Sequence, residues 1–130
     1  MYKFLFIAIF SLSPIWGYAT CSQKNLAGTW HDYAITSASV AECSFKIDAK
    51  GKINPASVCT NYTAKADLPP LNITSGEFKL SKSCSISGNI GVSTTPMVFF
   101  KGQLDQTKLS FTGISRNSSG NVVMHHFVKE

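Results

Sequence analysis

Beyond residue 20, hydrophobic and polar positions alternate in short segments that Gly, Asn, Pro and Ser residues separate. Such alternation is typical of strands with one buried face, and no segment keeps helical spacing over a convincing length. The pattern predicts eight strands, at 28–36, 42–48, 57–63, 77–80, 84–92, 97–104, 108–115 and 121–128. We expect an all-β fold, an antiparallel meander closed into a barrel, with a β-sandwich as the alternative.

The first predicted hairpin brings two cysteines together. Facing residues of an antiparallel pair have a constant sum of positions, so a turn centred on Gly51 places Cys43 opposite Cys59. Facing Cβ atoms lie close enough for a disulfide, and of the four cysteines this pairing leaves Cys21 for Cys84. The same arithmetic at later turns predicts the facing pairs Phe78 with Ile86, Gly102 with Phe111, Phe100 with Gly113, and Ser115 with Val122.

Residues 64–76 are the longest interruption of the strand pattern. Two consecutive prolines make this segment stiff and extended, and apolar side chains flank them. We expect a crossover packed across the mouth of the barrel, with a lid or a contact segment as the alternative. The candidate residues for binding a ligand or partner are Leu68, Pro69, Pro70 and Leu71 of this segment, together with Trp30.

The N-terminal residues 1–19 have the features of a signal peptide. Lys3 supplies the positive start, residues 4–12 are an apolar stretch too short to span a bilayer, and Gly17 and Ala19 are small residues suited to cleavage. We therefore expect a protein that is secreted or periplasmic, where disulfides form. Lipid attachment at Cys21 is the alternative, and it would leave an odd number of cysteines for pairing.

Removal of residues 1–19 from the 130 would leave 111 residues, the size of one domain spanning 20–130. Of the twelve Lys and Arg residues Lys3 would be lost, leaving eleven against seven Asp and Glu, or a net charge of +4. The lysines are dispersed and Arg116 is the single arginine, whereas nucleic-acid binding needs a concentrated basic face. We expect a monomer that does not bind nucleic acid and has no transmembrane segment.

The histidines are the main candidates for site chemistry. Neighbouring strand residues point to opposite faces, so neither His31 with Asp32 nor His125 with His126 can hold one metal ion together. One histidine from each pair can still meet across the adjoining first and last strands of a closed barrel, which would make a two-ligand site at best. No linear motif indicates a catalytic nucleophile, a phosphate loop or a cofactor. We therefore expect no metal, cofactor or catalytic residue, and for an enzyme His31 and His126 are the residues to test first.

The stretch Leu26-Ala27-Gly28-Thr29-Trp30 stands where the first strand begins. Gly-x-Trp at this place resembles the entry to lipocalins and avidins, which implies an antiparallel barrel with Trp30 plugging one end. Followed by Cys43 and Cys59, the same stretch also resembles the small periplasmic inhibitors of bacterial metalloproteases. That resemblance implies a disulfide between early strands of an eight-stranded barrel, and residues 20–25 as the arm that enters a protease cleft.

These observations favour a binding protein over an enzyme. In the first hypothesis it restrains another protein, such as an envelope hydrolase, through its loops and the Pro69–Pro70 segment. In the second the barrel holds a small apolar ligand among its phenylalanines, Phe45, Phe78, Phe100, Phe111 and Phe127. Because a barrel of this size can be filled by its own side chains, the first hypothesis is preferred. The triplets at Asn61, Asn72 and Asn117 are glycosylation acceptors only in a host with eukaryotic secretion.

Overall fold

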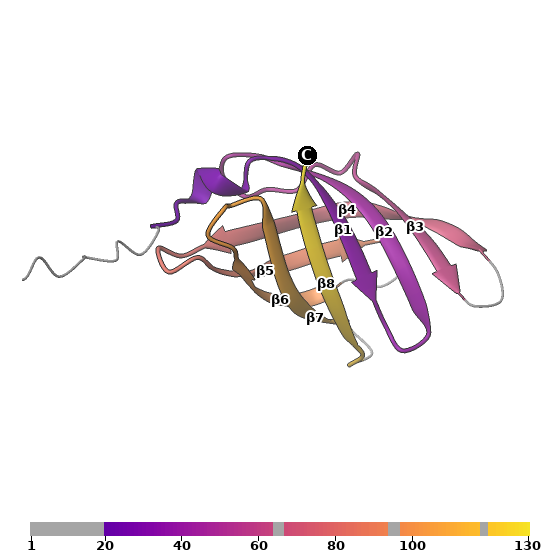
Figure 1. The fold of residues 1–130 in the computed structure, drawn as a ribbon. Helices are drawn as coiled ribbons and strands as arrows, with labels where there is room; N and C mark the ends of the chain where they lie inside the picture. The colour runs from indigo at the N-terminus through magenta and orange to yellow at the C-terminus, as the bar shows by residue number, and fades with distance from the viewer. Residues whose placement is uncertain (1–19, 64–66, 94–96, 118–119) are drawn as a thin grey trace, which may run out of the picture.

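The computed structural model describes residues 20–63, 67–93, 97–117 and 120–130, so the predicted signal peptide lies outside the described residues. Eight antiparallel strands form one closed barrel in the order of the sequence (Figure 1). The strands are β1 (Gly28–Ile35), β2 (Ser39–Ile47), β3 (Val58–Thr63), β4 (Asp67–Leu80), β5 (Ser85–Val92), β6 (Met97–Leu104), β7 (Ser110–Asn117) and β8 (Val122–Lys129). The predicted fold class and strand number are confirmed.

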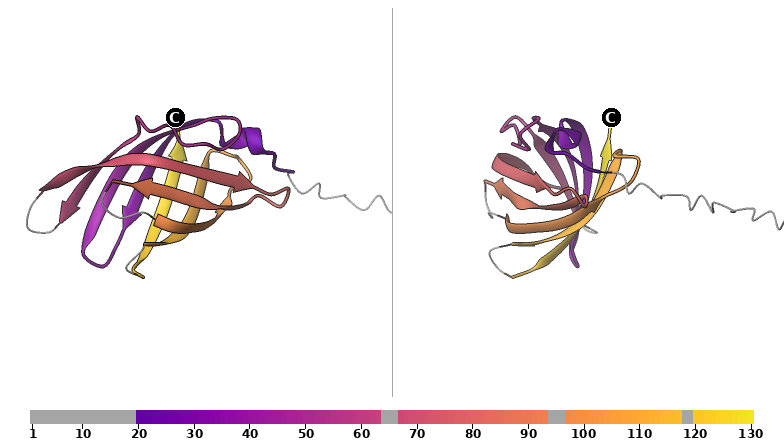
Figure 2. Two further views of the ribbon diagram at one scale, coloured as in Figure 1. Left: turned by 180° about the vertical axis from the view of Figure 1, so that it is seen from behind. Right: turned by 90° about the vertical axis from the view of Figure 1, so that its left-hand side faces the viewer.

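Pairing between the first and last strands closes the barrel. Trp30 on β1 faces Lys129 on β8, and the ladder continues to Ile35 opposite Met124. The strands curl around a common axis, and the end of the chain lies beside the start of β1 (Figure 2). Inward and outward side chains alternate along β1 and β8, as the sequence pattern predicted.

A short 3-10 helix, η1 (Gln23–Leu26), covers one end of the barrel, which we call the helix end. The side chain of Gln23 fastens this helix to β4, because its amide nitrogen donates to the Phe78 carbonyl at 2.6 Å and its amide oxygen accepts from the Leu80 N–H at 2.8 Å. Gly51, with φ of 87°, lies so close to Gln23 and Phe78 that a Cβ there would collide with both. The opposite end, which carries the β1–β2, β3–β4, β5–β6 and β7–β8 connections, is the far end.

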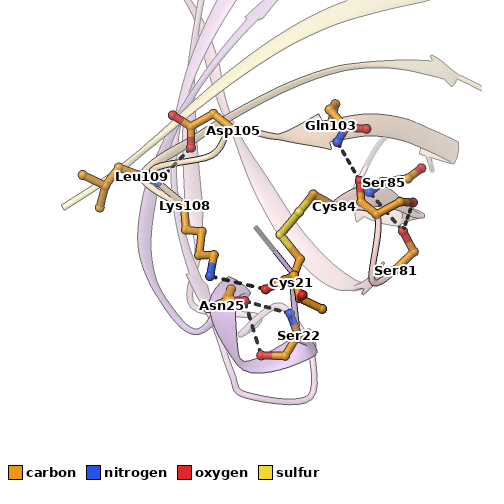
Figure 3. The surroundings of a disulfide bond; sticks show 12 residues. Cys21, Ser22, Asn25, Ser81, Cys84, Ser85, Gln103, Asp105, Lys108 and Leu109 are labelled. Carbon is orange, nitrogen blue, oxygen red and sulfur yellow. Dashed lines mark hydrogen bonds between the residues drawn. A yellow bond between two sulfur atoms is a disulfide. The ribbon is translucent and has the colours of Figure 1, made fainter. Parts of the chain in front are cut away.

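Both expected disulfides are present. Cys43 faces Cys59 across β2 and β3 and is bonded to it, and Cys21 is bonded to Cys84 beside the helix end (Figure 3). The second bond ties the segment before η1 to the turn between β4 and β5. Since the sulfur of Cys21 is in a disulfide, the alternative of lipid attachment at Cys21 does not fit this structure.

The prediction of a break at 64–76 is wrong over its described part, because Asp67–Leu80 is one strand of 14 residues. The prolines are tolerated at a bulge. Leu71 faces Cys59 and Leu68 faces Asn61, and the register shifts between these two pairs, where Pro69 and Pro70 lie. Pro69 and Pro70 stand against the single residue Thr60, so they form the bulge, and the ladder is interrupted there in a way that tolerates proline.

Three hairpin registers also differ from the prediction. The observed facing pairs are Phe78 with Gly88, Leu80 with Ile86, Gly102 with Gly113, Leu104 with Phe111, and Ser115 with Val123. Two of the differences arise where the turn carries a residue with left-handed backbone, Cys84 at φ 65° and Lys108 at φ 62°. Such residues lengthen the turn, so each residue before the turn faces a residue two positions later than predicted. The Phe100 ring nevertheless covers Gly113, because a Cβ at Gly113 would collide with it.

The core toward the helix end is aromatic. Its fully buried rings are Trp30, Phe45, Phe78, Phe100, Phe111 and Phe127. They contact one another directly, with Phe111 stacked on Phe127 at a centroid distance of 4.0 Å and Trp30 edge-on to Phe111 at 4.8 Å. The indole N–H of Trp30 donates to the Leu26 carbonyl at 2.7 Å, which satisfies its polar atom inside the core. This half of the barrel is therefore filled by its own side chains.

Candidate functional site

Three polar side chains on adjacent strands form a buried chain beyond the aromatic cluster, toward the far end. His125 Nδ1 lies 2.8 Å from Asp32 Oδ2, and His125 Nε2 lies 2.8 Å from Ser115 Oγ. Asp32, Ser115 and His125 are 1%, 2% and 4% exposed, respectively. With its proton on Nδ1, the imidazole donates a hydrogen bond to the carboxylate and accepts one from the serine hydroxyl group. We call these residues the inner polar chain.

The barrel makes room for the imidazole by placing small residues beside it. His125 faces Ala34 on β1 and Gly113 on β7. The rings of Phe100 and Phe127 lie against the imidazole, with centroids at 5.4 Å and 5.8 Å. The inner polar chain thus borders the aromatic cluster directly, and its surroundings have a low dielectric constant that strengthens each of its hydrogen bonds.

Burial raises the pKa of Asp32 above its ordinary value of 3.8. Loss of hydration is the largest cause, and it outweighs the opposing effects of the hydrogen bond and charge of His125 and of the backbone N–H and charge of His126. The contact between His125 Nδ1 and Asp32 Oδ2 lies between side chains that are at most 1% exposed, so the charge of the carboxylate is one that desolvation opposes.

Two acceptor atoms in this part of the interior lack a partner. Asp32 Oδ1 and Asn61 Oδ1 are buried and have no hydrogen bond within the part of the chain that the structure describes. Asn61 faces Ala41 on β2, and Ala41 faces Ala34, the neighbour of His125. A buried acceptor without a donor costs about 1–3 kcal/mol, so each of these two oxygens has the capacity to accept a further hydrogen bond.

The order Asp32–His125–Ser115 is the connectivity of a catalytic triad for acyl transfer. Hydrolysis also needs N–H donors for the oxyanion and access for the substrate. Ser115 lies in the middle of the sheet, paired with Phe100 on one side and Val123 on the other, so its strand uses its backbone N–H groups in the ladders. The geometry is suited to holding a ligand by hydrogen bonds.

The sequence favoured His31 and His126 for a first test, but the structure brings together the other member of each neighbouring pair, Asp32 and His125. His31 points outward and its Nε2 lies 3.0 Å from Glu130 Oε1, and His126 is exposed. Asp32 and His125 point inward and meet, whereas His31 and His126 do not. The signal was present in the sequence, because Asp32 shares its face with Trp30 and His125 shares its face with Phe127. Ser115 carried no comparable signal.

The other predicted site residues lie in different parts of the molecule, with Trp30 inside the core and residues 68–71 on β4. Trp30 is 0% exposed and packs in the aromatic cluster, so it plugs the helix end. Pro69 and Pro70 are exposed on β4, and Leu71 is half-buried against the core. The backbone of Leu68 belongs to β4, and its side chain lies outside the described residues.

Among the described residues, no three side chains of the metal-binding types His, Cys, Asp and Glu come together. In the same part of the chain, no helix is long and apolar enough to cross a bilayer.

No protein-family model and no curated protein matches the chain. The fold is similar to designed barrels. A redesigned β-barrel, mFAP1, solved bound to DFHBI, has a TM-score of 0.62 at 12% identity and covers 83% of this chain and 97% of its own. A de novo designed fluorescence-activating β-barrel has a TM-score of 0.57 at 13% identity, covering 80% of this chain and 93% of its own. At this identity the likeness shows the fold alone, and the resemblances to lipocalins, avidins and protease inhibitors are not confirmed.

Proposed function

We propose that the protein is an exported binding protein that holds a small, largely apolar ligand with a hydrogen-bond donor in the far half of its barrel. The donor, such as an N–H or a phenolic O–H, meets Asp32 on the inner polar chain. Apolar parts of the ligand lie against Phe100 and the small residues around His125. The protein changes no bond in the ligand.

The unpartnered Asp32 Oδ1 is the observation that carries this proposal. Asp32 keeps a buried acceptor although burial opposes its charge, and an isosteric apolar residue would avoid that cost. Small ligand sites are typically apolar with a few converging polar groups, and the inner polar chain beside Phe100 has this composition. The redesigned β-barrel mFAP1, which has a similar fold, is bound to the small molecule DFHBI, and this supports the use of such a barrel for binding.

Native mass spectrometry of protein purified from its host tests the proposal. We expect a retained small-molecule mass on the unmodified protein and its loss from Asp32→Asn. Glu42→Gln is the matched control, because it makes the same carboxylate-to-amide change on an exposed outward position of β2. Circular dichroism confirms that each variant keeps the barrel.

A clean apoprotein mass under gentle ionisation argues against the proposal. A retained mass that survives in Asp32→Asn at the same occupancy places the ligand elsewhere and also contradicts it.

Restraint of another protein, such as an envelope hydrolase, is the second candidate function. The exposed Pro69–Pro70 pair on β4 favours it, because prolines present a rigid surface at little entropic cost. Affinity capture from envelope extract at moderate salt is expected to recover one stoichiometric protein with the unmodified bait. Replacing both prolines with alanine is expected to reduce that recovery, and recovery of the bait alone contradicts this candidate.

A further inference from the structure

A continuous row of exposed apolar side chains crosses the outside of four strands. Ile35 faces Val40 on β2 and Met124 on β8, and Met124 faces Ile114 on β7. Their exposed fractions are Val40 42%, Ile35 50%, Met124 63% and Ile114 49%. Tyr33 and Val122 extend the row to either side. We call these six residues the outer apolar face.

The outer apolar face is larger than the single apolar residues that protein surfaces usually carry. The row residues are direct cross-strand partners, so their side chains form one surface without a charge between them. Two shallow hollows lie in it, one of about 330 Å³ lined by Ile35, Ile114 and Met124 among others, and one of about 340 Å³ beside Ile114 and Val122. Continuous exposed patches of this kind mark interaction surfaces.

Two opposite charges stand at diagonal corners of this face. Glu42 faces Tyr33 and so lies beside Val40 toward the helix end, whereas Arg116 faces Val122 and lies beside Ile114 toward the far end. Both side chains are exposed, and within the described ranges neither has an ion-pair partner. The face is therefore apolar at its centre and acidic at one corner, and it is basic on the opposite side, where the exposed Lys101 of β6 also faces Ile114.

We propose that the outer apolar face binds a second copy of this chain in an isologous contact. Consider a two-fold axis that lies in the plane of the face, passes through its centre and is perpendicular to the line from Glu42 to Arg116. This axis places Glu42 of each copy against Arg116 of the other. The same patch is then complementary to itself, as a two-fold dimer requires. An anionic bilayer, in contrast, would attract Arg116 but repel Glu42. The dimer departs from the monomer that the sequence predicts.

Sedimentation velocity of the purified protein over a wide concentration range tests the contact. We expect a reversible monomer–dimer equilibrium, and Met124→Lys is expected to raise the dimer dissociation constant about tenfold or more. Val58→Lys is the matched control, because Val58 is also 50% exposed but lies on β3 outside the face. It is expected to leave the equilibrium unchanged.

Charge exchange distinguishes a self-complementary contact from any other. Glu42→Arg and Arg116→Glu are each expected to weaken the dimer, because each puts like charges together twice. The double variant is expected to restore it. The proposal is overturned by a monomer at every concentration, by a dimer that tolerates Met124→Lys, or by a double variant no tighter than the singles. Met124-dependent binding of the monomer to vesicles of phosphatidylglycerol would assign the face to a bilayer and overturn it as well.

Discussion

The two halves of the barrel interior use their inward positions differently. Toward the helix end, rings fill the space and the one polar atom of Trp30 is satisfied by the Leu26 carbonyl. Beyond them, Asp32, His125 and Ser115 occupy equivalent inward positions and leave an acceptor without a partner. One half therefore gains stability from aromatic packing, whereas the other keeps hydrogen-bonding groups among smaller buried residues such as Ala34 and Val123. The contrast supports the assignment of the proposed binding site to the second half.

The largest expected effect lies in the aromatic half. Phe111→Ala removes a fully buried ring that contacts Trp30, Phe78 and Phe127, and is expected to lower the free energy of unfolding by about 3–5 kcal/mol. Urea denaturation measures this change. Leu109→Ala, at a residue 56% exposed, is the control and is expected to stay within about 0.5 kcal/mol. Equal losses for the two variants would contradict the assignment of this half as the stabilising core.

A smaller effect, with a characteristic pH dependence, is expected for Asp32→Asn. The substitution keeps the size of the side chain but disturbs the hydrogen bond to His125, at an expected cost of about 1–3 kcal/mol. Because the folded-state pKa of Asp32 is raised above 3.8, the folded protein holds a proton that the unfolded chain has lost between these values. The contribution of Asp32 to stability is therefore highest below about pH 4 and falls as the pH rises through the folded-state pKa.

Urea midpoints of the two proteins between about pH 4 and 7 measure this prediction. The unmodified protein is expected to lose stability relative to Asp32→Asn as the pH rises. Parallel profiles would show that the carboxyl group does not carry the proposed proton.

Ser115→Ala is expected to have the smallest effect on stability, about 0.5–1.5 kcal/mol. It removes the hydrogen bond to His125 Nε2 and little volume. Thr112→Ala changes a hydroxyl-bearing residue on the outward face of the same strand and serves as the comparison. If the inner polar chain serves binding, Ser115→Ala reduces retained ligand in native mass spectra more than it reduces stability, whereas ligand retention equal to that of Thr112→Ala would count against it.

The fold could be predicted because it depends on local patterns. Alternation located all eight strands, and the position of Gly51 fixed the register that joins Cys43 to Cys59. The later registers depended on how many residues each turn holds. Left-handed backbone at Cys84 and Lys108, where glycine would have been the usual signal, could not be recognised from residue type.

The site was only partly predictable. Face parity was enough to separate Asp32 from His31 and His125 from His126, once Trp30 and Phe127 were taken as the inward reference. Ser115 joined the chain through the β7–β8 register, which the sequence placed one residue away. The strand character of Pro69 and Pro70 depended on the bulge that they form, which is a property of the pairing with β3 and not of either residue.

The pairing of β1 with β8 has a consequence for how the molecule is made. A hydrogen bond from the Glu130 N–H to the Thr29 carbonyl joins the segment after β8 to the start of β1, so the ring of strands cannot close until β8 has been synthesised. A shortened chain lacking β8 would leave β1 and β7 as bare edges, each able to recruit strands from its neighbours. Premature termination is therefore expected to yield insoluble aggregates instead of a smaller working barrel.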